Sequence, residues 1–176
     1  NIQGLPTWYQ IRVSYEGYMA PRHTSEILVA FNLDTLHEDI ANLPPGGVCI
    51  HNSDYRSIPQ RDDITYYGVP VNIFVAKTGM KGKLRDYIAN MVYVGAVAYI
   101  LGIPLEQIEN ALDFHFKGRR KLVDSNMDMV HLAYEWAAEN LVKTDPYQIS
   151  PMNETAGLIM MTGNEGTTPS FTNSNN

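Results

Sequence analysis

The apolar residues of this chain change their period along its length, and each period predicts a type of element. Residues 8–14 alternate, with Tyr9, Ile11 and Val13 on one face, which predicts a β-strand that follows a polar loop. The alternative is only a loop that enters an edge strand. Residues 16–17 read as a turn, after which 18–20 would return as a short antiparallel partner.

Two short, continuous apolar runs, at 27–31 and 48–50, predict strands that are buried on both faces. Between them Asp34 is the expected N-cap of a helix whose apolar stripe is Leu36, Ile40 and Leu43. The Pro-Pro-Gly-Gly sequence that follows ends this helix. Strand, helix and strand in this order predict parallel pairing with a right-handed crossover.

The second half of the chain is mostly helical in pattern. Residues 64–67 predict another strand, 68–70 a turn, and 71–76 either a strand or the start of a helix. Three helices follow: one over 84–101 that Gly102 ends, one that Pro104 opens, and one that Asp124 or Ser125 caps. The apolar stripe of the last helix is Met127, Val130, Leu132, Tyr134, Ala137, Ala138 and Leu141. The predicted class is α/β, with a Rossmann-like, mostly parallel sheet and flanking helices.

Composition narrows the kind of protein. The 176 residues are 44% hydrophobic and 18% charged, with a net charge of -6, which is typical of a globular chain and disfavours a nucleic-acid partner. Cys49 is the single cysteine, so neither an internal disulfide nor a cysteine-bound metal cluster can form. The longest apolar run, 91–101, is too short to cross a bilayer. We therefore expect a cytoplasmic protein with neither a nucleic-acid nor a membrane partner.

Catalytic chemistry is not evident from the residues. None of the five histidines has a metal-ligand spacing, and His51, Ser53 and Asp54 lack the nucleophile elbow that a triad needs. Cys49 lies within a predicted strand, which favours a core residue over a nucleophile. No catalytic residue and no metal ligand is therefore assigned.

Two stretches carry candidate binding groups. The opening loop offers the amide, hydroxyl and open backbone groups of Asn1, Gln3, Gly4 and Thr7. The basic cluster, defined as Lys117, Arg119, Arg120 and Lys121, could hold the phosphates of a nucleotide or of coenzyme A. Its alternative is a helix C-terminus that Gly118 ends and the cations stabilise. The loop at 78–83 is either an anion-binding turn or a solvated connection.

Six stretches together resemble one known family. They are the opening Asn-Ile-Gln-Gly-Leu-Pro-Thr-Trp-Tyr-Gln-Ile-Arg-Val-Ser and the segments 27–33, 43–50, 90–95, 116–126 and 159–165, in that order. The chain resembles the gamma-type domain of the 2-oxoacid:ferredoxin oxidoreductases over residues 1–165, and most of all the alpha subunit of the 2-oxoglutarate-type enzymes.

The resemblance also sets an expected domain plan. The family's first βαβ unit, with its Gly-rich turn, is absent before Asn1, and its Y-P-I-T-P-S element is missing. The expected plan is an N-terminally incomplete gamma-type domain at 1–147, a linker toward a thiamine-binding domain at 148–166, and a disordered polar tail at 167–176. The chain would then be part of a larger polypeptide or complex.

The resemblance implies a function for the assembled enzyme. That enzyme would convert a 2-oxoacid to acyl-CoA with thiamine diphosphate, Mg²⁺, coenzyme A and [4Fe-4S] clusters, and would reduce ferredoxin. This chain alone would bind none of these cofactors and have no activity. Its opening loop, with Arg12, would border the active site, and its basic cluster would bind coenzyme A phosphates. The alternative is a non-catalytic α/β interaction module of a larger complex.

Overall fold

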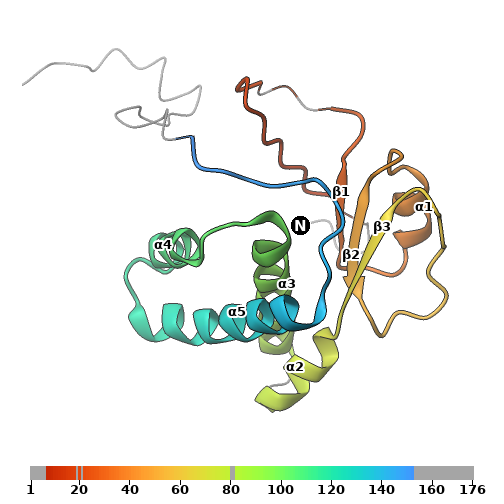
Figure 1. Cartoon of the computed structure of the whole chain (residues 1–176). Coiled ribbons are helices and arrows are strands. Elements are labelled where there is room, and N and C mark those ends of the chain that lie inside the picture. Colours follow the sequence, from red (N-terminus) through yellow and green to blue (C-terminus); the bar gives the residue numbers. More distant parts are fainter. Residues whose placement is uncertain (1–6, 19, 21, 80–81, 153–176) are drawn as a thin grey trace, which may run out of the picture.

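The computed structural model describes residues 7–18, 20, 22–79 and 82–152 (Figure 1). Its elements follow the chain in this order: β1 (Ile27–Ala30), α1 (Leu36–Ala41), β2 (Val48–Asn52), β3 (Thr65–Val69), α2 (Val71–Thr78), α3 (Lys83–Leu101), α4 (Leu105–Phe116) and α5 (Arg120–Asn140). Among these described residues, no helix has the length and apolar content needed to cross a membrane.

The three strands form one parallel sheet in the order β1-β2-β3. Ile27 lies opposite Val48, which in turn lies opposite Thr65. The α/β class and the parallel strand–helix–strand unit are therefore confirmed. The residues of the expected linker beyond 152 and the polar tail lie outside the described residues.

Alternating side chains divide the sheet between two apolar layers. On β2, Val48 and Ile50 join the cluster that contains α3 and α5, whereas Cys49 joins the cluster under α1. On β3, Tyr67 faces the helical group and Tyr66 packs on the α1 side. Figure 1 shows α1 on one side of the sheet and the helices α2–α5 on the other.

The strand predicted at 8–14 is wrong, because this stretch has no regular secondary structure. Ile11 is 74% exposed, and no strand among the described residues pairs with this segment. Its side chains bind elsewhere instead: Trp8 Nε1 donates to Asp39 Oδ1 at 2.8 Å, and Gln10 Nε2 donates to Ser25 Oγ at 2.9 Å. Alternating apolar residues form a β-strand only where a neighbouring strand completes the hydrogen-bond ladder.

The turn that follows is confirmed, since Gly17 has φ +68° and its N–H donates to Ser14 O at 3.3 Å. The antiparallel return is wrong for the described residues 18 and 20, which form no strand.

Strand β1 also differs from the prediction of a strand at 27–31. It ends at Ala30, one residue early. Burial on both faces is wrong for residues 27–29, which are only half-buried, because β1 is an outer strand of the described sheet.

The predicted stripe of α1 is confirmed, since Leu36, Ile40 and Leu43 are buried. Its N-cap is Thr35 rather than Asp34. Asp34 instead donates its backbone N–H to Asn32 Oδ1 at 2.9 Å, which places it in the loop before the helix.

Two boundaries in the second half also differ from prediction, and one open alternative is resolved. Residues 68–69 belong to β3 instead of a turn, and the ambiguous 71–76 is helical. The last helix starts at Arg120, because Lys117 and Gly118 (φ +53° and +72°) end α4 and the chain turns directly into α5.

In the last helix Met127, Val130 and Ala137 are buried as expected, but Leu132 is half exposed and Ala138 is exposed, so the predicted stripe was too wide. A Cβ at Gly95 would lie 2.4 Å from Val130 O. Only glycine therefore lets α3 cross α5 this closely.

Candidate functional site

The opening loop is described only from Thr7 onward, so Asn1, Gln3 and Gly4 lie outside the described residues. Thr7 is exposed in an irregular stretch. Arg12 shapes the bend that follows: its Nη1 donates to Ala20 O at 2.6 Å. Its guanidinium carbon also lies 5.2 Å from the ring centre of Tyr18, a distance at which cation–π attraction operates. The described part of the loop is thus held by polar contacts at its own bend.

The same stretch presents a run of exposed aromatic side chains. Trp8, Tyr9, Tyr15 and Tyr18 are all exposed, Tyr9 to 90%. Exposed apolar side chains mark interaction sites when they gather on one surface, so this aromatic-rich segment is a candidate for contact with a partner.

The basic cluster lies at the tight connection between α4 and α5. Arg119 Nε donates to Phe116 O at 3.2 Å, which is the contact that the helix-end interpretation predicts. Lys117 takes the left-handed conformation that ends α4. Lys117 and Lys121 are both exposed.

Arg120 is engaged by three carboxylates. Its Nη2 lies 2.7 Å from Glu109 Oε1 and 3.0 Å from Asp124 Oδ1, and its Nη1 lies 3.5 Å from Asp113 Oδ1. The hydrogen bond with Glu109 raises the pKa of the guanidinium, and the neighbouring negative charges add to this shift. The positive charge of Arg120, one of the four cations of the cluster, is therefore countered by acids that the sequence spacing did not reveal.

Sequence reasoning missed a pair of tyrosines at the carboxyl end of β1. Tyr93 donates its hydroxyl to Ala30 O at 3.1 Å, and Tyr55 donates to Phe31 O at 3.0 Å. Burial is the largest of several causes that raise the pKa of Tyr93, so its hydroxyl remains a proton donor. Parallel sheets bind ligands outside the carboxyl ends of their strands, which makes this end a candidate position for a ligand. The sequence signal that could have pointed to this pair was Tyr93, a polar-tipped residue within the apolar pattern of the predicted 84–101 helix.

The remaining titratable groups in the sheet do not form a catalytic set. His51 Nδ1 lies 2.9 Å from Asn52 O, so the ring is engaged by the backbone of the next residue. Cys49 is buried, and this burial together with the charge of Asp39 raises the pKa of its thiol to about 12. A thiol in that state is not a nucleophile at neutral pH, so Cys49 is a core residue, as expected.

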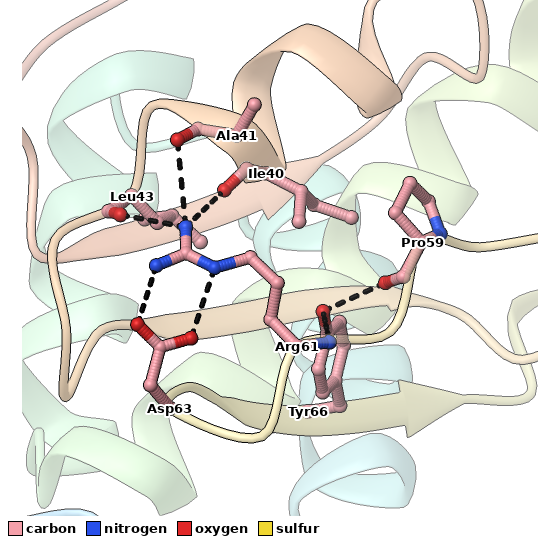
Figure 2. Close-up of polar contacts among 7 residues, drawn as sticks. All are labelled: Ile40, Ala41, Leu43, Pro59, Arg61, Asp63 and Tyr66. Atoms are coloured by element: carbon pink, nitrogen blue, oxygen red, sulfur yellow. Dashed lines mark hydrogen bonds and ion pairs between the residues drawn. The ribbon is translucent and has the colours of Figure 1, made fainter.

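Arg61 forms a second polar centre, which Figure 2 shows in close-up. Its Nη1 donates at 2.8 Å to Ile40 O in the last turn of α1 and, also at 2.8 Å, to Leu43 O just after the helix. Asp63 accepts from the other edge of the guanidinium at 2.6 and 3.0 Å. Tyr66 completes the centre: its hydroxyl accepts from Arg61 N at 3.1 Å and donates to Pro59 O at 2.7 Å. This centre caps a helix and fixes a loop.

The described residues do not fit a metal cluster. Nowhere in residues 7–18, 20, 22–79 and 82–152 do three His, Cys, Asp or Glu side chains gather as metal ligands. An iron–sulfur cluster is held by about four thiolates, and Cys49, the only cysteine of the chain, is buried and protonated.

Comparison with known proteins identifies the class. The profile described as "Pyruvate ferredoxin/flavodoxin oxidoreductase" matches residues 1–136, and the chain belongs to this family. The resemblance to the gamma-type domain of the 2-oxoacid:ferredoxin oxidoreductases is thereby confirmed.

Particular relatives place the match more closely. The chain is 31% identical to the alpha subunit of 2-oxoacid:ferredoxin oxidoreductase 2 from Aeropyrum pernix, over an alignment of 206 positions including gaps. This alignment covers 94% of this chain and 32% of the relative. It is 28% identical over 118 residues to the ketoisovalerate oxidoreductase subunit VorA of Methanothermobacter marburgensis, covering 67% of this chain and 24% of the relative. The chain thus spans about a quarter to a third of the length of these curated relatives.

A solved structure shares the fold. The 2-oxoglutarate:ferredoxin oxidoreductase from Magnetococcus marinus, solved with 2-oxoglutarate, coenzyme A and succinyl-CoA bound, matches with a TM-score of 0.61 and 19% identity. The match covers 71% of this chain and 22% of that one.

Proposed function

We propose that this chain serves as the gamma-type domain of an enzyme that oxidatively decarboxylates a 2-oxoglutarate-like 2-oxoacid to acyl-CoA and reduces ferredoxin. The observation that carries this proposal is the family match over residues 1–136. The Aeropyrum pernix relative supports it, since that protein is named for the same class of reaction. Other subunits or domains of the enzyme, and ferredoxin, are the proposed partners.

Thiamine diphosphate, Mg²⁺ and the [4Fe-4S] clusters belong on those partners in this proposal. Thiamine diphosphate supplies the carbanion stabilisation, and the clusters carry single electrons. The donor set of the described residues does not fit a cluster, because the chain has one cysteine and it is buried. This domain then acts by holding substrate or coenzyme A.

The opening loop is the proposed point of contact with the 2-oxoacid site. The contacts of Trp8 and Arg12 support it, because they anchor the segment that follows the loop. We expect Gln3→Ala to lower kcat about tenfold, equivalent to roughly 1.4 kcal/mol, if its amide binds more tightly in the transition state. Gly4→Val should lower kcat further, because a branched side chain fills space and resists positive φ.

The matched control is Gln10→Ala, since that amide lies in the same segment but is directed to Ser25. Steady-state ferredoxin reduction by the assembled enzyme measures both variants, and melting temperature checks the fold. Equal kcat values for Gln3→Ala and the wild type would show that the loop does not contact the 2-oxoacid site.

The basic cluster is the proposed site for coenzyme A phosphates. Because Arg120 is engaged by three carboxylates, Arg119, Lys117 and Lys121 are the better candidates. We expect Arg119→Gln to raise the apparent coenzyme A constant about threefold or more, since an arginine pairs bidentately with phosphate. Arg120→Gln should change the constant less, and the exposed Arg56→Gln is the control for loss of one positive charge. An unchanged constant in Arg119→Gln would leave the cluster as a helix end only.

The second candidate function is a non-catalytic interaction module. The exposed aromatic run from Trp8 to Tyr18 favours it, because that surface suits a protein partner. Purification of the natural complex separates the two: 2-oxoacid-dependent ferredoxin reduction supports the enzyme, and its absence from a cofactor-loaded complex supports the module.

A further inference from the structure

The segment that leaves α5, residues 141–149, is irregular in conformation but well anchored. We call it the exit segment. Figure 1 shows it running from the end of α5 back past the sheet. It contains neither helix nor strand, yet Asp145 near its middle is buried. A buried carboxylate in an irregular segment needs partners to offset its desolvation.

Tyr67 of β3 supplies the first of these partners. Its side chain is buried in the helical face of the sheet. The hydroxyl accepts from Thr144 N at 3.0 Å and donates to Asp145 Oδ2 at 2.6 Å. One hydroxyl of the sheet therefore holds two consecutive residues of the exit segment.

The other carboxylate oxygen is used within the segment itself. Asp145 Oδ1 accepts from Lys143 Nζ at 2.7 Å and from Tyr147 N at 2.9 Å. Lys143 Nζ also donates to Tyr147 O at 2.7 Å, which closes a small ring of polar contacts. Both oxygens of the carboxylate have partners, and its side chain is only 1% exposed.

Two further contacts extend this anchoring to other elements. Ile149 N donates to Leu101 O at the end of α3, at 2.8 Å. Tyr147 donates its hydroxyl to Gly46 O, in the turn before β2, at 3.3 Å. The exit segment thus links β3, the turn before β2, α3 and α5 through hydrogen bonds.

We infer that Asp145 is a positioning residue, which with Tyr67 fixes the exit segment as a strap between the helical group and the sheet. The helical group carries the basic cluster at the start of α5, while Trp8 of the opening segment is bound to Asp39 on the opposite face of the sheet. The strap therefore ties the helical group, which carries the region that the proposed function assigns to coenzyme A, to the sheet, whose other face holds the segment that follows the loop assigned to the 2-oxoacid. The expected effect on turnover rests on the proposed function, whereas the fixing of the exit segment by Tyr67 and Asp145 does not.

Hydrogen exchange in the whole chain, within the assembled enzyme, tests the geometric part. The variant is Tyr67→Phe, and its matched control is Tyr66→Phe, which removes the neighbouring hydroxyl on the opposite face. We expect Tyr67→Phe to speed exchange at the amides of Thr144, Tyr147 and Ile149 at least about tenfold. Thr144 N loses its acceptor directly, whereas Tyr147 N and Ile149 N keep Asp145 and Leu101 as acceptors and exchange faster because the released segment opens more often. The β2–β3 ladder should stay protected in both variants. Unchanged exchange at 144–149 in Tyr67→Phe would overturn the strap.

Turnover tests the catalytic part, with Asp145→Asn beside Val123→Ala. Val123 is fully buried between α5 and α4, away from the strap, so its variant controls for general loss of stability. At a temperature where both variants remain folded, we expect Asp145→Asn to lower kcat severalfold without raising KM for the 2-oxoacid, and Val123→Ala to change neither. Equal kcat in the two variants would overturn the positioning role. A wild-type complex without 2-oxoacid activity would overturn the proposed function instead and leave the exchange result to decide the strap.

Discussion

Adjacent tyrosines on β3 organise two loops of this domain in the same chemical way but in different surroundings. Tyr66 accepts from Arg61 N and donates to Pro59 O on the α1 side of the sheet. Tyr67 accepts from Thr144 N and donates to Asp145 on the helical side. In each loop a cation and an aspartate two residues later form an ion pair, Arg61 with Asp63 and Lys143 with Asp145.

The two centres differ in their access to water. The side chain of Asp63 is 45% exposed, whereas that of Asp145 is 1% exposed. Water competes for an exposed ion pair, so such pairs contribute little to stability, but removing one partner from a buried pair leaves an uncompensated charge. The two centres have the same hydrogen-bond pattern, but we expect them to contribute unequally to stability, because only Asp145 is buried.

The pKa of each aspartate is lowered in the folded protein, because in both centres the hydrogen bonds outweigh the cost of desolvation. The pKa of Asp63 is lowered, first of all by the hydrogen bonds from Arg61. For Asp145 burial acts in the opposite sense and raises the pKa, but the hydrogen bonds from Lys143 and Tyr67 outweigh it, so the net shift is also downward. Asp145 is thus ionised at neutral pH in spite of its burial.

The largest expected effect is the loss of the buried carboxylate. Asp145→Ala should lower the free energy of unfolding by about 3 kcal/mol, because Tyr67, Lys143 and Tyr147 N lose an acceptor in a dry site. Asp63→Ala should have a clearly smaller effect, since water replaces its oxygens. Urea denaturation of both variants measures the difference, with the exposed Asp128→Ala on α5 as the control. Equal losses at 63 and 145 would contradict the role assigned to burial.

The pH dependence of Asp145 offers a finer test. A carboxyl group whose pKa is lowered by folding stabilises the protein above its usual value, 3.8 here, and this contribution is lost as pH falls through the lowered value. The difference in unfolding free energy between wild type and Asp145→Asn should hold constant from about pH 7 to 5 and shrink below about pH 4. Lys143 and Tyr67 are the side chains whose polar groups face the carboxylate. A difference that grew on acidification would mean that Asp145 is protonated in the folded protein.

The apolar pattern was sufficient for the parallel strand–helix–strand unit, because runs such as 48–50 and the stripe of Leu36 and Ile40 report local burial. It failed at 8–14, where alternation required a neighbouring strand that the described residues do not contain. The apolar pattern did not predict the polar centres either. Tyr67 and Asp145 are 78 positions apart, and Arg120 meets Glu109 across the turn between two helices. Such pairs depend on how packed elements align, which the period of one element does not encode.

The smallest effect is expected at Trp8, which tests whether exposure alone predicts a weak contact. Its indole N–H donates to Asp39 Oδ1 at 2.8 Å; Trp8 is exposed and Asp39 is half-buried. Trp8→Phe removes this donor but keeps an aromatic ring, so we expect a change in unfolding free energy of about 0.5 kcal/mol or less for the chain in isolation. The same substitution in the assembled enzyme should cost more if a partner covers the aromatic run, because the hydrogen bond would then lie away from water. Thermal unfolding of the two forms measures this contrast: a large loss in the isolated chain would show that Trp8 resembles Asp145 rather than Asp63, and that exposure is an insufficient guide to the strength of these contacts.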